Sequence, residues 1–207
     1  MDARVHNTPR RDQIAFDARA NAYVLPSGAG IHLSYADDRG RKGVDLGAEI
    51  DYMPDGIGLH LTPLTPTIAY RTFTANDSNY VFLSPDGRIN ADLQLIADDG
   101  TGMKLYSTPQ DTTAMFQLAD SLAALIPATL QDLTLSLNHV NVAELCDIMP
   151  YMPRLTGMLY GDAHLVQTTQ TLSVAIDAGV DAFTYEGAEI GDLMLNATYL
   201  PVGDSCH

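Results

Sequence analysis

The sequence predicts a mainly β fold: a curved antiparallel meander with two short helices. Three observations predict it. Apolar and polar residues alternate in run after run, turns rich in Gly, Pro and Asp separate these runs every 10–15 residues, and helical spacing appears in two short stretches. A parallel α/β sheet would need a helix between most strands. Successive strands are therefore expected to be antiparallel neighbours.

The N-terminal part of the chain is predicted to form four strands after a polar, frayed start at residues 1–12. The apolar alternations cover residues 14–20, 31–35, 44–52 and 57–61. The predicted connections are a Gly-rich loop at 26–30 and turns at 37–40 and 54–56, which hold the Pro and Gly that such turns need. Pro63 and Pro66 are expected to interrupt the last strand, because neither can donate to a ladder.

Residues 70–106 carry the clearest meander. Residues 80–83 form an apolar β-prone run, and Pro85 and Gly87 then suit a tight turn. The return strand has one apolar and one polar face, the mark of period 2. Its apolar side is Ile89, Ala91, Leu93 and Leu95. A second Gly-containing turn at 98–102 leads to another alternation at 103–106.

The period changes after residue 106. Residues 112–126 have helical spacing and end at Pro127, and a second helix is predicted at 142–149 with a capping box formed by Asn141 and Glu144. A strand is expected between them at 130–137. Further strands are expected at 155–165, 172–176 and 190–199, which brings the total to roughly eleven, and residues 183–185 are expected to lead into a turn at Glu186 and Gly187.

The charge distribution limits the partners. The 207 residues include 26 acids and 11 bases, a net charge of −15, and residues 105–207 contain a single base, Arg154. Because phosphate binding needs clustered Lys and Arg, nucleic acid is not expected as a partner. Acidic surfaces mostly serve solubility.

No catalytic, metal or cofactor site is predicted, and the chain is interpreted as non-enzymatic. No two of the six histidines have metal-binding spacing, the nucleophile elbow is absent, and Gly-rich residues 27–30 lack a P-loop Lys. The Asp-rich turns fit no EF-hand. Cys146 is expected to be a buried thiol, with a bridge to Cys206 as the alternative in an oxidising compartment.

No apolar stretch is long enough for a membrane-spanning helix, and the first residues lack the apolar core of a signal peptide. Both ends look cut, so a longer parent chain is expected. The apolar stripe of the strands then has two interpretations. It packs against a second sheet in a sandwich, or it lines a groove for an apolar ligand such as a lipid chain.

Three segments resemble a known family. Residues 70–81 (YRTFTANDSNYV) with 98–102 (DDGTG) resemble the TamB-type translocation and assembly module proteins of Bacteroidetes. Residues 130–165 resemble the AsmA/TamB repeat: a strand, a short helix, proline, then an L-x-G-x-L-x-G strand. Residues 183–193 resemble the next unit, whereas the helix expected within 105–129 departs from the pattern. The chain is thus interpreted as a single fragment of an extended repeat β-domain, residues 1–207, with a repeat boundary near 108–130.

The resemblance implies a taco-shaped β-sheet with an apolar interior that crosses the periplasm. An N-terminal segment outside this chain would anchor the protein in the inner membrane. The implied partners are phospholipid and an outer-membrane assembly protein of the TamA/BamA type, and the implied roles are phospholipid transport and outer-membrane protein assembly. The predicted groove residues are Ile89, Ala91, Leu93, Leu95, Leu155, Gly157, Leu159, Gly161, Leu172, Val174 and Ile176.

Two questions stay open at the level of sequence. Gly157 and Gly161 either leave room for acyl chains or let the sheet bend. The alternative function is a compact β-sandwich module for adhesion or glycan binding, with a closed core and no lipid groove. A photo-reactive residue at Leu93 or Leu159 is expected to capture phospholipid if the groove exists.

Overall fold

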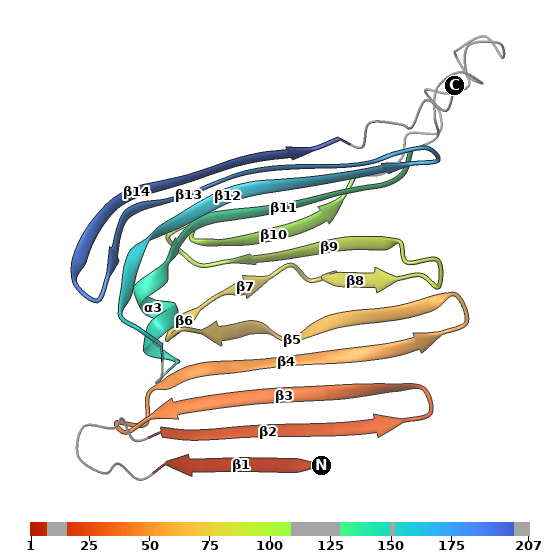
Figure 1. Ribbon diagram of the computed structural model, residues 1–207. Helices are drawn as coiled ribbons and strands as arrows, with labels where there is room; N and C mark the ends of the chain where they lie inside the picture. Colours follow the sequence, from red (N-terminus) through yellow and green to blue (C-terminus); the bar gives the residue numbers. More distant parts are fainter. Residues whose placement is uncertain (8–15, 109–128, 150–151, 201–207) are drawn as a thin grey trace, which may run out of the picture.

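The computed structural model describes residues 1–7, 16–108, 129–149 and 152–200. It confirms the mainly β class: the described residues form one antiparallel sheet of 14 strands and one short helix, α3 (Figure 1). The elements are β1 Asp2–Asn7, β2 Phe16–Leu25, β3 Gly28–Asp37, β4 Lys42–Met53, β5 Gly56–Ile68, β6 Arg71–Thr72, β7 Thr74–Ala75, β8 Tyr80–Leu83, β9 Ile89–Ile96, β10 Gly102–Ser107, β11 Thr129–Asn141, α3 Val142–Asp147, β12 Leu155–Thr168, β13 Leu172–Tyr185 and β14 Ala188–Tyr199. The predicted helix at 112–126 lies outside the described residues.

The strands follow one another across the sheet nearly in chain order. The path is β1-β2-β3-β4-β5-β8-β9-β10-β11-β12-β13-β14, with the two-residue strands β6 and β7 beside it, on β5 and β9. This is the meander that short turns predict, because a tight turn can only join antiparallel neighbours. The described strands do not divide into the two packed sheets of a sandwich.

The register places apolar side chains of successive strands side by side on one side of the sheet. One row of direct cross-strand neighbours runs from β2 to β9 and consists of Val24, Ala29, Ile50, Leu59, Val81 and Ala91. A second row continues from β9 to β14 and consists of Leu93, Leu105, Leu135, Ala163, Ile176 and Ala197. We call the side that carries both rows the apolar face.

The opposite side, the polar face, has a matching row from β9 to β14. It consists of Gln94, Lys104, Ser136, Asp162, Asp177 and Asn196. Each of these residues lies next in sequence to a member of an apolar row. The two faces therefore follow directly from the period-2 alternation in the sequence.

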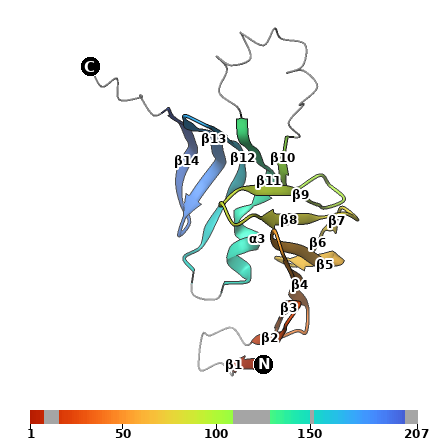
Figure 2. The same ribbon diagram turned by 90° about the vertical axis from the view of Figure 1, so that its right-hand side faces the viewer.

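The sheet is strongly curved, and α3 lies between its two limbs (Figure 2). The helix starts where β11 ends, packs near β12, and reaches β4 and β6 on the opposite limb through Ile148 and Glu144. A Cβ added to Gly43 would lie 2.7 Å from the Tyr35 ring and 3.0 Å from Ile148 Cγ2. Because Tyr35 belongs to the apolar face through its pairing with Ala18 and Val44, that face lines the inside of the curve.

A small core occupies the middle of the apolar face. Ala75, Leu93 and Leu95 are at most 8% exposed. The half-buried side chains around them are Leu61, Ile68, Phe73, Val81, Met103 and Leu105. Neighbouring strands of one curved sheet supply all of these contacts, so the curvature itself creates the core.

Two asparagines join β5 to β9 where β8 is too short to do so. The Asn79 side chain accepts from the Leu61 N–H at 2.6 Å and donates to the Asn76 carbonyl at 3.1 Å. The Asn76 side chain accepts from the Gln94 N–H at 2.9 Å and donates to the Asp92 carbonyl at 3.1 Å. Both side chains thus replace backbone groups of a missing strand. Asn79 is 2% exposed as a result.

A line of bulges bends the limb formed by β11–β14. The register shifts at residues 138–139 of β11, at Gly157 of β12, and at 181–182 of β13, and Gly191 on β14 has a φ of 97°. His139 and Ala182 adopt φ of 49°, and the Ala182 N–H donates to the Asp192 side chain at 2.8 Å. Such aligned bulges turn neighbouring strands together. Beyond them β12–β14 curve sharply in Figure 1.

Three local predictions are wrong. The polar start was expected to fray, but residues 2–7 form β1, whose Ala3 and Val5 continue the apolar face against Ala20 and Ala18. The loop predicted at 26–30 is shorter, because β3 begins at Gly28. The sheet contains 14 strands rather than eleven, since β1 and the short strands β6 and β7 lack a long apolar alternation.

The prolines at 63 and 66 interrupt the β4–β5 ladder as predicted, but they do not end the strand. β5 continues to Ile68, but its register against β4 jumps from Gly47–Thr62 to Asp45–Thr67. Residues 63–66 therefore form a bulge opposite a single residue of β4. Neither proline has to donate a hydrogen bond there, which is how the strand tolerates both.

Candidate functional site

The apolar face remains open to solvent on both sides of the small core. Large apolar side chains on it are 40–76% exposed. They are Val5, Val24, Ile31, Leu33, Tyr52, Ile57, Leu83, Leu172, Leu193, Leu195 and Tyr199. Exposed apolar patches of this kind, on either side of the core, are typical of interaction sites.

Nine of the eleven predicted groove residues lie on the apolar face. On β9 these are Ile89, Ala91, Leu93 and Leu95, of which the last three are buried. On β12 and β13 they are the half-buried Leu159, Gly161, Val174 and Ile176 and the exposed Leu172. Leu155 and Gly157 lie beyond and at the β12 bulge, where the alternation is interrupted. The predicted set therefore includes three side chains that other residues already cover.

The two glycines of β12 sit against neighbouring backbone. A Cβ at Gly161 would lie 2.6 Å from the Ala178 Cβ and 2.7 Å from the Asp177 carbonyl oxygen. At Gly157, where φ is 140°, a Cβ would lie 2.6 Å from Val180 Cγ1 and 3.0 Å from the Asp181 carbonyl oxygen. These contacts favour the second interpretation of the glycines, that they let the sheet bend.

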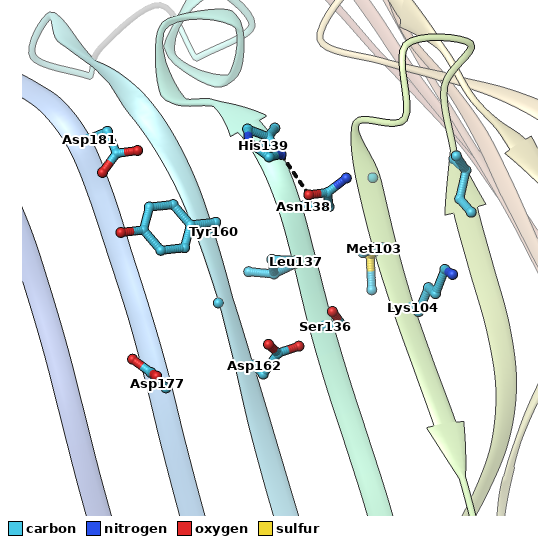
Figure 3. Close-up of a pocket in the computed structure, with 13 residues that line it drawn as sticks. Met103, Lys104, Ser136, Leu137, Asn138, His139, Tyr160, Asp162, Asp177 and Asp181 are labelled. Atoms are coloured by element: carbon cyan, nitrogen blue, oxygen red, sulfur yellow. Dashed lines mark hydrogen bonds between the residues drawn. The ribbon is translucent and has the colours of Figure 1, made fainter.

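The polar face has a hollow of its own beside the β11 bulge (Figure 3). Asp162 and Asp177 are direct cross-strand neighbours there, and Asp181 and Tyr160 lie next to them. The charge of Asp181, together with burial, raises the pKa of Tyr160. Lys104 is the one cation in the lining. Within the described residues, no three His, Cys, Asp or Glu side chains are arranged to hold a metal ion.

Several of the described histidines take part in local pairs. His32 lies 2.7 Å from Asp45, and His164 lies 2.7 Å from Asp132. His60 bonds the Asn79 carbonyl. Cys146 was expected to be buried, but it is only half-buried because α3 is six residues long and has no fully buried residue. Cys206 and His207 lie outside the described residues.

A second concave feature lies where α3 meets the limb that contains β4 and β6. Arg41, Ala69, Tyr70, Arg71, Glu144 and Asp147 line a pocket of about 300 Å³. Arg71 forms a bidentate ion pair with Glu144, at 2.7 and 3.0 Å, and a further ion pair with Asp99. These hydrogen bonds raise the pKa of Arg71. Glu144 is 73 residues from Arg71 in sequence, so sequence spacing alone offered no signal for this site.

Two tyrosines connect this pocket with the apolar face. Burial raises the pKa of Tyr70, and the neighbouring Tyr35 hydroxyl adds to the effect. The Tyr35 side chain is 8% exposed, and its hydroxyl has no hydrogen-bond partner among the described residues. The Arg41 guanidinium lies over the Tyr70 ring, 4.8 Å from the ring centre. The pocket is therefore amphipathic, with charged groups at its mouth and aromatic rings beside it.

The chain matches no protein-family model, no curated protein and no solved structure. Within the described residues, α3 is the one helix, and it is too short and too polar to cross a bilayer. The features of this chain that point to a function are therefore the two faces of the sheet and the pocket beside α3.

Proposed function

We propose that this chain is a section of a TamB-like periplasmic protein whose apolar face carries the acyl chains of phospholipids. In this proposal the protein is not an enzyme, an N-terminal segment outside the chain anchors it in the inner membrane, and it serves phospholipid transport, outer-membrane protein assembly through a partner of the TamA/BamA type, or both. The observation that carries the proposal is the continuity of the apolar rows from β2 to β14.

The dimensions of the sheet suit a lipid chain. The pairing path contains 12 strands, so at about 4.8 Å per strand the apolar face extends over roughly 50 Å. One leaflet of a bilayer core is about 15 Å thick, so an extended acyl chain needs roughly three strand spacings. Each acyl-chain methylene that is removed from water contributes about 0.8 kcal/mol to binding. The apolar side chains that are 40% or more exposed therefore offer a favourable surface for such a chain.

The sandwich alternative finds less support. A glycan-binding or adhesion sandwich needs a second sheet to cover the apolar face, and the described strands form one sheet. The exposed leucines on β3 and β14 have no partner within the described residues, whereas in a sandwich they would be core.

Photo-crosslinking in cells tests the proposal. A photo-reactive amino acid at Leu33 or Leu195, which are 40% and 54% exposed, should capture phospholipid detectable by mass spectrometry. Leu93 is a poorer position than the sequence suggested, because it is 8% exposed. The matched controls are Ser34 and Asn196, the next residues on the same strands, whose side chains point to the polar face. Equal lipid capture on both faces, or capture on the polar face alone, contradicts the proposal.

A further inference from the structure

The pocket beside α3 has the chemistry of a headgroup site. We propose that it binds the headgroup of an amine-bearing zwitterionic phospholipid, with the phosphate on Arg41 and the ammonium group on Asp147, while the acyl chains lie along the apolar face. This inference rests on the proposed function, because it assumes that the apolar face holds lipid. It adds a location and a headgroup preference that the apolar face alone does not supply.

Arg41 has donors to spare for a phosphate. Its Nε donates to Asp37 at 2.7 Å, but its terminal Nη groups donate to nothing within the described residues. The contact with the Tyr70 ring holds the Arg41 guanidinium in place, and the Arg41 side chain is 62% exposed. A planar guanidinium with free terminal N–H groups is the usual partner of a phosphate in proteins.

Asp147 supplies the opposite charge. Glu144 is already paired with Arg71, but the Asp147 carboxylate forms no ion pair within the described part of the chain. Asp147 nevertheless lines the same pocket as Arg41 and interacts with it through charge. The pocket thus offers one available cation and one available anion, the arrangement that a zwitterion requires.

The charge balance favours a headgroup that brings a cation. Arg41 and Arg71 are surrounded by Asp37, Asp99, Glu144 and Asp147, two positive charges against four negative ones. An anionic headgroup without an amine would add negative charge to this surplus. The ethanolamine headgroup of a phospholipid carries one phosphodiester charge and one ammonium charge, so it is neutral overall and places its ammonium group beside Asp147. We therefore expect ethanolamine-type lipids to be preferred over glycerol-type lipids.

The neighbouring aromatic residues connect the headgroup to the chains. Tyr35 belongs to the apolar face, lies near Ile148 at the end of α3, and neighbours Tyr70, which lines the pocket. The two tyrosine rings therefore lie between the charged groups of the pocket and the apolar face.

Lipid exchange with mixed vesicles tests the site. The purified protein is incubated with vesicles of equal parts phosphatidylethanolamine and phosphatidylglycerol with identical chains, re-isolated, and its bound lipid is quantified by mass spectrometry. Wild type should retain an excess of phosphatidylethanolamine. Asp147→Asn should lower the ratio of the two lipids by about three- to ten-fold, and Arg41→Gln should lower retention of both, as expected for lost charge-assisted hydrogen bonds at a partly exposed site.

The controls come from the adjacent turn. Arg39→Gln and Asp38→Asn remove the same charges from exposed residues that do not line the pocket, and they should leave the ratio unchanged. Asp147→Asn is nearly isosteric, and a thermal melt verifies that each variant is folded. An unchanged ratio in Asp147→Asn, or an equal change in Asp38→Asn, overturns the headgroup site.

Two further outcomes separate this site from the proposed function. If Asp147→Asn and Arg41→Gln retain lipid as wild type does but Leu33→Asp loses it, the apolar face stands and the headgroup site is wrong. If wild type retains neither lipid, both proposals fail. Free glycerophosphoethanolamine is added as a competitor in a parallel sample, and displacement of lipid by an equal concentration of it would show that the pocket takes a soluble amino-phosphate instead.

Discussion

Replacing Asn79 with alanine tests how the sheet is held together between β5 and β9. The substitution removes the side-chain amide that accepts from the Leu61 N–H at 2.6 Å and donates to the Asn76 carbonyl at 3.1 Å, with a longer contact of 3.4 Å to the Leu61 carbonyl. Asn79 is 2% exposed, so water reaches these groups poorly once the amide is gone.

The expected loss of stability follows from these bonds. A hydrogen bond contributes about 1 kcal/mol net, and a buried donor left unsatisfied costs about 1–3 kcal/mol. With one short bond and two longer ones removed, we expect Asn79→Ala to lower the free energy of unfolding by about 2–4 kcal/mol. That is a large part of the roughly 5–15 kcal/mol typical of a folded domain.

Urea denaturation followed by circular dichroism measures this loss. For a slope of about 2 kcal/mol per molar urea, the midpoint should fall by about 1–2 M. Ser78→Ala, an exposed neighbour in the same turn, serves as the control and should change the midpoint little. A loss below about 0.5 kcal/mol in Asn79→Ala, or an equal loss in Ser78→Ala, would refute the idea that asparagine side chains replace a strand here.

Two other predictions concern acid stability and the bend. The Thr101 backbone amide and then Arg71 hold the pKa of Asp99 below its ordinary value, so its stabilisation is present above the unfolded pKa of about 3.9 and is lost as the pH falls through the folded value. Asp99→Asn should thus unfold more easily than wild type at pH 7, and this difference should shrink as the pH falls below the unfolded pKa of about 3.9; a constant difference in melting temperature as the pH is lowered would be inconsistent with that account. Gly161→Ala should destabilise the sheet by about 1–3 kcal/mol, because its Cβ meets the Ala178 Cβ and the Asp177 carbonyl, whereas Gly187→Ala, which meets nothing within 4 Å, should cost about 1 kcal/mol through its φ of 82° alone. Chemical denaturation of both variants checks this order, and the reverse order would show that β12 has room for side chains at its glycines.

The alternation of apolar and polar residues was enough to predict most of the sheet. Period 2 fixes which side chains share a face, so β4, β9 and the part of β12 after its bulge were found with one face correctly assigned. Turn residues predicted where strands end, because Gly40, Gly87 and Gly187 adopt the positive φ that such turns demand. Neither signal depends on residues far away in the sequence.

Features that depend on distant contacts escaped prediction. Asn76 and Asn79 look like ordinary turn residues until β9 and β5 are placed beside them. β1 is too polar to stand out, and β5 passes two prolines because β4 leaves one residue opposite them. The pocket beside α3 combines residues 41, 71 and 147, which only the curvature of the sheet brings together.

The meander has a mechanical consequence, because each strand of the pairing path bonds to its neighbours on that path and, apart from the short strands β6 and β7, to no other strand among the described residues. Force applied along the chain from its two ends should peel the strands away one at a time from β1 and from β14, rather than shear many bonds at once. The Arg71–Glu144 pair interrupts this order, since it links α3 to β6, 73 residues earlier in the sequence. Unfolding from the β14 side should therefore pause at α3. The ion pair thus divides the sheet into weakly held outer strands, β12–β14, and a part that resists force more strongly.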